Sequence, residues 1–208
     1  MQTKKIEIDQ KNTRVAQVME VTEQFAQYLE LEKKQRFYLN ILVEESLGMI
    51  GMIAESFKGE FWLEGEKGEN SEIHLQFRTY LDAEKRKELL KVATQESEKS
   101  TGFMNRLRGV IESCLYAALE DEEEETQTVS RPSAAYVPRG VVLPTAISSG
   151  CVWSMEEYRK GVEKAENTDK TAKESWDELE KSIVANIADD IRVSMKGATV
   201  EMVIKKRF

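Results

Sequence analysis

The chain has 208 residues, a formal net charge of −8 and a single histidine. This length allows one good-sized hydrophobic core or at most two small ones. An acidic chain is repelled by nucleic-acid phosphates and by anionic lipid surfaces, so we expect neither a nucleic-acid nor a membrane partner. One histidine also weighs strongly against histidine-based metal sites and histidine-dependent catalytic triads.

The N-terminal region and the cysteines bear on the cellular compartment. The first ten residues are charged and do not resemble a secretory signal, and no apolar stretch approaches the roughly 18 residues that a membrane span needs. Cys114 and Cys151 lack the spacing of a metal or redox motif, so we expect both to be reduced thiols. These features predict a cytoplasmic protein.

The N-terminal half contains short strands and two long helices. Polar and apolar residues alternate over 4–9, and helical spacing follows over about 15–29 and about 33–57. Two more strands are predicted over 60–64 and 72–81, with a glycine-containing turn between them at 66–70. The alternation places His74 on the solvated face of its strand.

The C-terminal half contains helices, a proline-containing segment and a hairpin. Helical spacing over 103–119 precedes six acidic residues at 120–125 and all three prolines, so 120–150 is predicted to be a mobile loop. Ser154 and Glu157 form a capping box that starts a helix. Residues 191–204 alternate around a Lys196-Gly197 turn, which predicts a β-hairpin. A longer helix is predicted over about 169–188, with Trp176, Leu179, Ile183, Val184 and Ile187 on one stripe.

The order of these elements predicts an α+β fold. Strands grouped in antiparallel hairpins and helices in runs favour helices packed on one face of a mixed or antiparallel sheet. We expect a single domain over 1–208, in which 115–188 is an insertion that forms either a lid or a separate appendage.

The second long helix carries a carboxylate in an unusual position. At about 100° per residue, Glu45 falls in the middle of an apolar arc, whereas Glu44 falls on the polar side. A carboxylate within an apolar stripe must be paired, protonated or facing a cavity. Glu45 is therefore either a functional group or a structural ion-pair partner. The arc is formed by Tyr38, Ile41, Leu42, Met49, Met52 and Ile53.

The segment from Ile41 to Ile50, with the sequence ILVEESLGMI, resembles the N-box helix of GHKL-type ATPases, which include histidine kinases and anti-sigma-factor serine kinases. The anti-sigma kinases are the most similar in layout, because they too begin with a strand and two helices and end with a strand hairpin. The resemblance covers roughly 4–114 and 189–208. It implies a histidine-kinase-like ATPase fold.

The resemblance also implies roles for individual residues. Glu45 matches the general base of the family, whereas Met49 occupies the position of the asparagine that holds magnesium, and a thioether is a poor ligand for that hard cation. No Asp-x-Gly-x-Gly box follows Thr79. Thr101 and Gly102 are similar to part of the second glycine box and are the candidate nucleotide contacts.

These departures favour a non-catalytic regulatory module that binds a protein partner on a degenerate GHKL-like scaffold. On this hypothesis no cofactor and no metal is bound, and the loop-rich insertion contributes to the interface. The alternative is an ATP- and magnesium-dependent serine kinase or ATPase of the anti-sigma type, with Glu45 as the base. A third hypothesis makes Met49, Met52 and Met104 the lining of an apolar ligand pocket, unless these side chains simply fill the core.

Overall fold

The computed structural model describes residues 1–9, 14–53, 57–79, 141–142, 151–165, 170–196 and 199–208. No helix in these ranges is both long enough and apolar enough to cross a membrane. The helices are α1 (Val15–Tyr28), α2 (Lys33–Ile53), α5 (Met155–Ala165), α6 (Lys170–Lys181) and α7 (Ile183–Ile187). The strands are β1 (Ile6–Asp9), β2 (Phe57–Gly65), β3 (Asn70–Thr79), β4 (Val141–Val142), β5 (Cys151–Ser154), β6 (Asp190–Lys196) and β7 (Thr199–Arg207).

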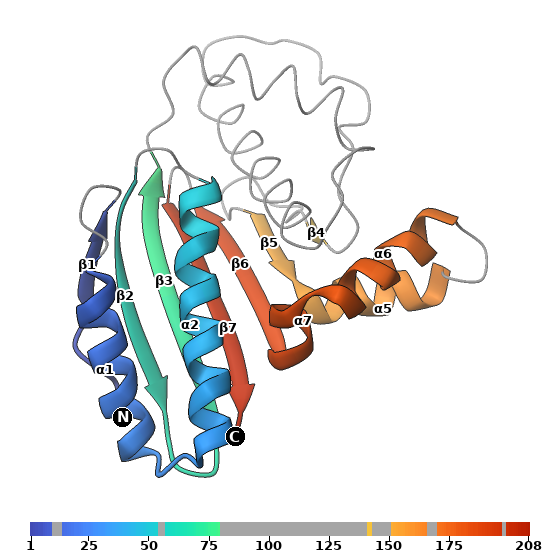
Figure 1. The fold of residues 1–208 in the computed structure, drawn as a ribbon. Helices are drawn as coiled ribbons and strands as arrows, with labels where there is room; N and C mark the ends of the chain where they lie inside the picture. The colour runs from blue at the N-terminus through green and yellow to red at the C-terminus, as the bar shows by residue number, and fades with distance from the viewer. Residues whose placement is uncertain (10–13, 54–56, 80–140, 143–150, 166–169, 197–198) are drawn as a thin grey trace, which may run out of the picture.

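The described strands form one sheet in the order β1-β2-β3-β7-β6-β5-β4 (Figure 1). Every pairing between them is antiparallel. Strand β3 lies inside the sheet, because Ile73 is opposite Leu63 of β2 on one side and Ile204 of β7 on the other. The predicted α+β class and the predicted C-terminal hairpin are therefore confirmed, and a single sheet joins the N-terminal strand to that hairpin.

The core lies between one face of this sheet and the helices. Helices α1 and α2 cover that face, and α7 lies beside α2 (Figure 1). Because side chains alternate along a strand, every second residue of the long strands points into the core. The most deeply buried of these are Ile8, Phe61, Leu63, Ile73, Leu75, Phe77, Ile191, Val193, Val200, Met202 and Ile204. Burying each large apolar side chain contributes about 1.5–3 kcal/mol.

The turn between β2 and β3 forms as predicted. Gly68 has a φ of 79°, a left-handed conformation that glycine adopts without strain. The amide of Glu69 donates a hydrogen bond to the carbonyl oxygen of Glu66 at 3.0 Å, which closes the turn. Strand β2 is longer than predicted, and β3 begins two residues earlier than predicted, since pairing extends from Phe57 opposite Thr79 to Gly65 opposite Ser71.

Several described residues of 151–187 pack in the same hydrophobic core as the N-terminal strands and helices. Strand β5 pairs with β6, and Trp153, Met155, Tyr158 and Val162 join the hydrophobic core. Neither β4 nor β5 was predicted from the sequence. Strand β4 lies inside 120–150, the segment that was predicted to be a loop. The helix predicted over 103–119 lies outside the described residues.

The helix predicted over 169–188 is two helices. Helix α6 ends at Lys181, and the Ser182 hydroxyl accepts a hydrogen bond from the amide of Ala185 at 3.2 Å to start α7. Ser182 has an extended backbone, which separates the two helices. Leu179 and Val184 are nevertheless buried, and Trp176 and Ile187 pack against the core, so four of the five residues of the predicted stripe face the core. Ile183 is 59% exposed, whereas Val184 is buried.

Candidate functional site

The buried face of α2 is centred on Ser46, not on Glu45. Ser46 is fully buried, and its hydroxyl donates a hydrogen bond to the carbonyl oxygen of Val43 at 2.7 Å. Glu44 and Glu45 are both exposed. The predicted apolar arc around Glu45 is therefore wrong, and Glu45 needs no buried partner. The residues of α2 that pack on the sheet are Leu39, Leu42, Val43, Ser46, Met49 and Ile50.

The helical pattern was ambiguous because α2 is apolar on more than one side. Ile41 and Leu47 are only half-buried, and Phe37 is 61% exposed. Because α2 also has apolar residues on its exposed side, the spacing of apolar residues fits more than one choice of buried face, and the predicted face is rotated away from the face that the structure buries. The contact with the sheet decides the orientation.

Met49 is only 1% exposed and belongs to the hydrophobic core. In the resemblance to the N-box helix this is the position of the magnesium ligand, and the structure places an apolar thioether there among other apolar side chains. Thr101, Gly102 and Met104 lie outside the described residues, as does the side chain of Met52. Within the described part of the chain, no group of histidine, cysteine, aspartate or glutamate side chains is arranged to hold a metal ion.

No protein-family model matches this chain, and searches of curated proteins and of solved structures found no similar protein. The function is therefore inferred from the side chains themselves.

The sheet face opposite the helices carries a stacked row of side chains. The rings of Trp62 and His74 are stacked, with centroids 4.8 Å apart and planes 8° apart. The ammonium group of Lys5 lies over the Trp62 ring, 4.2 Å from its centroid. These residues lie opposite one another because Trp62 and His74 are paired in the register of β2 and β3.

His74 lies on the face away from the core, as the alternation predicts, but the predicted solvation is wrong. It is 8% exposed, because the Trp62 ring covers one side of the imidazole. Its Nε2 atom lies 3.1 Å from Oε2 of Glu72, and Oε1 of Glu72 lies 2.7 Å from Nζ of Lys205. The Glu72 carboxylate therefore lies within ion-pair distance of two side chains that can carry a positive charge, His74 on the same strand and Lys205 on β7.

The pKa of Glu72 reflects these opposing influences. Burial acts to raise it, but the hydrogen bond from Lys205 and the positive charges of Lys205 and His74 outweigh burial. The result is a pKa below the ordinary value of 4.5. The charged form of Glu72 thus stabilises the fold at a pH above 4.5, and this contribution is lost as the pH falls through the lower, folded-state pKa.

We expect Glu72→Gln to lower the melting temperature above pH 4.5 and to have a diminishing effect in more acidic solution. The physical reason is that the wild-type carboxylate becomes protonated there and loses its ion pairs, so the two proteins converge. Differential scanning fluorimetry of both proteins across this range checks the result. Glu69→Gln, at an exposed carboxylate in the adjacent turn, is the control and should have a smaller effect. An effect of Glu72→Gln that stays constant into acid would contradict this account.

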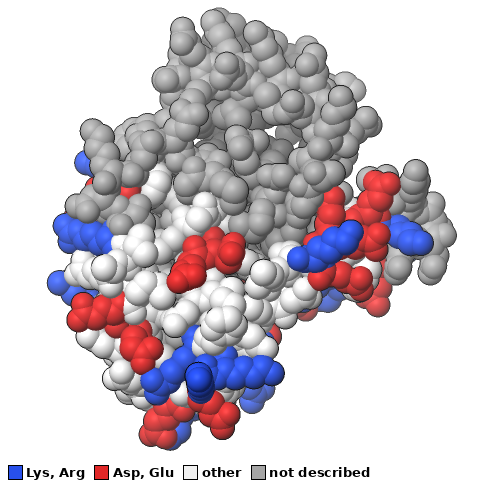
Figure 2. All heavy atoms as spheres, viewed as in Figure 1, with Lys and Arg blue, Asp and Glu red and all other residues white. Residues whose placement is uncertain are grey.

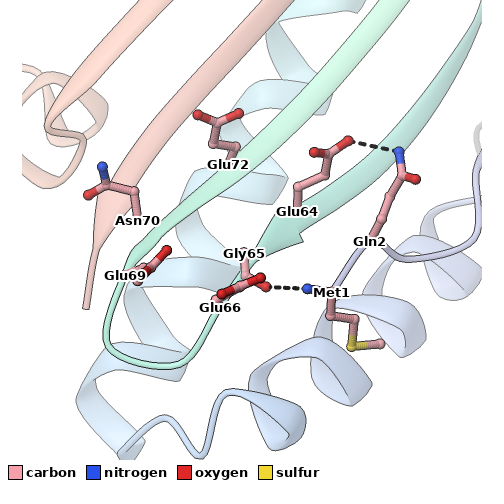
Figure 3. A pocket seen from close by; sticks show the side chains of 8 residues that line it. All are labelled: Met1, Gln2, Glu64, Gly65, Glu66, Glu69, Asn70 and Glu72. Atoms are coloured by element: carbon pink, nitrogen blue, oxygen red, sulfur yellow. Dashed lines mark hydrogen bonds between the residues drawn. The ribbon is translucent and has the colours of Figure 1, made fainter.

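A shallow pocket of about 400 Å³ lies beside the turn between β2 and β3 (Figure 3). Four glutamates line it: Glu64, Glu66, Glu69 and Glu72. Two of these carboxylates already have partners, since Glu64 accepts hydrogen bonds from Gln2 and Trp62 and Glu72 pairs with Lys205. The pocket is acidic and suits a cationic group rather than a nucleotide phosphate. It was not found in the sequence, where Glu66 and Glu69 are turn residues and Glu64 and Glu72 belong to the two predicted strands.

Proposed function

We propose that this chain is a non-catalytic regulatory module that binds a protein partner, on a scaffold similar to the GHKL-type ATPase domain. The observation that carries the proposal is the burial of Met49. In the similar family this position holds magnesium, whereas here it is a thioether buried in the core. The burial supports the interpretation that apolar packing has replaced the metal-binding part of the nucleotide site.

The order of elements supports the similarity of the scaffold. A strand, two helices, a strand pair and a closing hairpin occur in the sequence order that the N-box resemblance implies. The sheet joins the N-terminal strand to the closing hairpin through β2 and β3. A similar fold does not by itself imply the same function, so the proposed loss of nucleotide binding is inferred from the residues of α2.

Nucleotide binding is the second candidate function, and the exposure of Glu45 favours it. A carboxylate on the solvent side of α2 is accessible to a ligand, and a Cβ atom built on neighbouring Gly48 would meet no atom within 4 Å. An accessible base next to open space is compatible with a bound substrate hydroxyl or water.

Isothermal titration calorimetry with ATP and with ADP, each with and without magnesium, separates the two functions. We expect no heat of binding and no thermal stabilisation at millimolar nucleotide, because the metal position is apolar. Magnesium-dependent, saturable binding would overturn the proposal. In that case Glu45→Gln should abolish turnover, while Glu44→Gln, at the adjacent exposed carboxylate, should retain it.

The partner itself supplies the positive test. Once a protein partner is isolated with the chain, its affinity should be the same with and without ATP and the same for wild type and Glu45→Gln. A partner that binds only with magnesium and ATP would instead indicate a nucleotide-controlled switch.

A further inference from the structure

The solvent-facing side of α2 carries a stripe that is basic at the first turn of the helix and acidic near its middle. Lys33 and Lys34 are exposed in the first turn of α2. Glu44 and Glu45 are also exposed, Glu44 eleven residues after Lys33 and Glu45 eleven residues after Lys34. Eleven residues of helix correspond to about 16 Å. Figure 2 shows basic atoms gathered over the N-terminal part of α2 and an acidic group over its middle.

Apolar side chains lie between the two charged parts of this stripe, on the same side of α2. Phe37 is 61% exposed, Ile41 is half-buried, and Gly48 is exposed. At about 100° per residue, positions 34, 37, 41, 44, 45 and 48 fall within one stripe. The stripe therefore runs from basic through apolar to acidic, and Gly48 adds no side chain at its far end.

The order of these charges is unfavourable within a single helix. The N-terminus of a helix favours acidic residues, yet the first turn of α2 contains none and begins with two lysines. Lys34 has one aromatic contact, with Nζ 5.6 Å from the centroid of the Tyr38 ring. An external carboxylate near Lys33 and Lys34 would offset the repulsion between the lysines and the helix dipole.

We propose that this stripe of α2 is the interface with a second copy of the chain, in which the two α2 helices pack antiparallel about a two-fold axis near Leu39. In that arrangement Lys33 lies opposite Glu45 of the other copy and Lys34 lies opposite Glu44, and the same pairs repeat on the other side of the axis. Phe37 then packs against Ile41 of the other copy. A stripe that complements itself in this way fits an isologous dimer.

The size of the stripe sets the expected strength of association. A single pair of helices buries less than the roughly 1,600 Å² of a standard interface, so we expect a dimer that dissociates at micromolar concentration. Exposed ion pairs contribute little each and are screened by salt, so association should weaken as ionic strength rises. The inference does not rest on the proposed function, although it gives Glu45 a role in pairing rather than in catalysis.

Sedimentation velocity of the full chain across micromolar concentrations tests the proposal. Wild type should shift from monomer to dimer, and Lys33→Glu with Lys34→Glu should raise the dissociation constant by about tenfold or more, because each pair becomes repulsive. Adding Glu44→Lys and Glu45→Lys to that variant should restore the dimer, since both ends are then reversed together. Lys164→Glu on α5 carries the same type of charge change away from the stripe and should have no effect.

All these substitutions are at exposed positions, and circular dichroism confirms that each variant is folded. A wild-type protein that stays monomeric throughout would overturn the proposal. A dimer whose dissociation constant is unchanged by the lysine reversals, or is not restored by the fourfold variant, would also overturn it and place the contact on another surface.

Discussion

Replacing Gly59 with alanine is expected to lower the free energy of unfolding by about 3 kcal/mol or more, the cost of forcing an extra atom into a packed core. Gly59 lies in β2 opposite Ile8 of β1 and Phe77 of β3. A Cβ atom at this position would lie 2.4 Å from the backbone oxygen of Gln76 and 2.6 Å from the Cβ atom of Phe77. These atoms cannot move away, because β3 is held between β2 and β7 and Phe77 is buried in the core.

Gly48→Ala is the matched control for Gly59→Ala. A Cβ atom at Gly48 meets nothing within 4 Å, and an alanine inside a helix is favoured over glycine by about 1 kcal/mol, so this variant should be more stable than wild type. Urea denaturation at one low protein concentration compares the three proteins without a contribution from association. A Gly59→Ala protein as stable as wild type would show that the β2–β3 pair can separate locally, contrary to the packing described.

Replacing Asp190 with alanine is the second large effect, with an expected loss of about 3 kcal/mol, because one buried and three partly buried donors lose their acceptor. Asp190 is 6% exposed. Its Oδ1 atom accepts hydrogen bonds from the amide of Ile191 at 2.9 Å, from the amide of Glu156 at 3.1 Å and from the hydroxyl of Ser154 at 3.2 Å. Its Oδ2 atom accepts one from Nε of Arg192 at 2.8 Å.

These contacts make Asp190 the link between the start of β6 and the start of α5. The Ser154 hydroxyl accepts a hydrogen bond from the amide of Glu157 at 3.4 Å, which is the N-cap bond of the predicted capping box. The Asp190 carboxylate caps the same helix from a distant part of the chain. Without it, the first turn of α5 loses an acceptor that Ser154 alone does not replace.

Asp189→Ala is the control for Asp190→Ala. Asp189 is exposed and accepts hydrogen bonds from Nζ of Lys206 at 2.8 Å and from the amide of Arg207 at 2.6 Å. Because water can replace these contacts, the expected loss is about 1 kcal/mol or less. Thermal and urea unfolding of both variants provide the comparison. Equal losses would mean that burial of Asp190 contributes nothing beyond an ordinary surface interaction.

The sequence by itself determined the elements whose patterns are local and strong. Strict alternation in 72–77 and 191–204 predicted the strands that became β3, β6 and β7, because one face of each is buried by the helices and the other is polar. Gly68 predicted the β2–β3 turn and Ser154 the start of α5, since each requirement is met within a few residues of chain. The α+β class followed from the order of these elements.

Only the tertiary structure decided which side of each element is buried where more than one side is apolar. Helix α2 packs through Ser46 and Met49 rather than around Glu45, because its contacts with the sheet fix a rotation that the apolar spacing leaves open. His74 is buried because the ring of Trp62 covers it, and the two residues are neighbours only because β2 pairs with β3. Asp190 caps a helix that begins 35 residues earlier in the chain, at Met155. In each case the deciding contact joins residues distant in sequence, and local periodicity carries no information about such contacts.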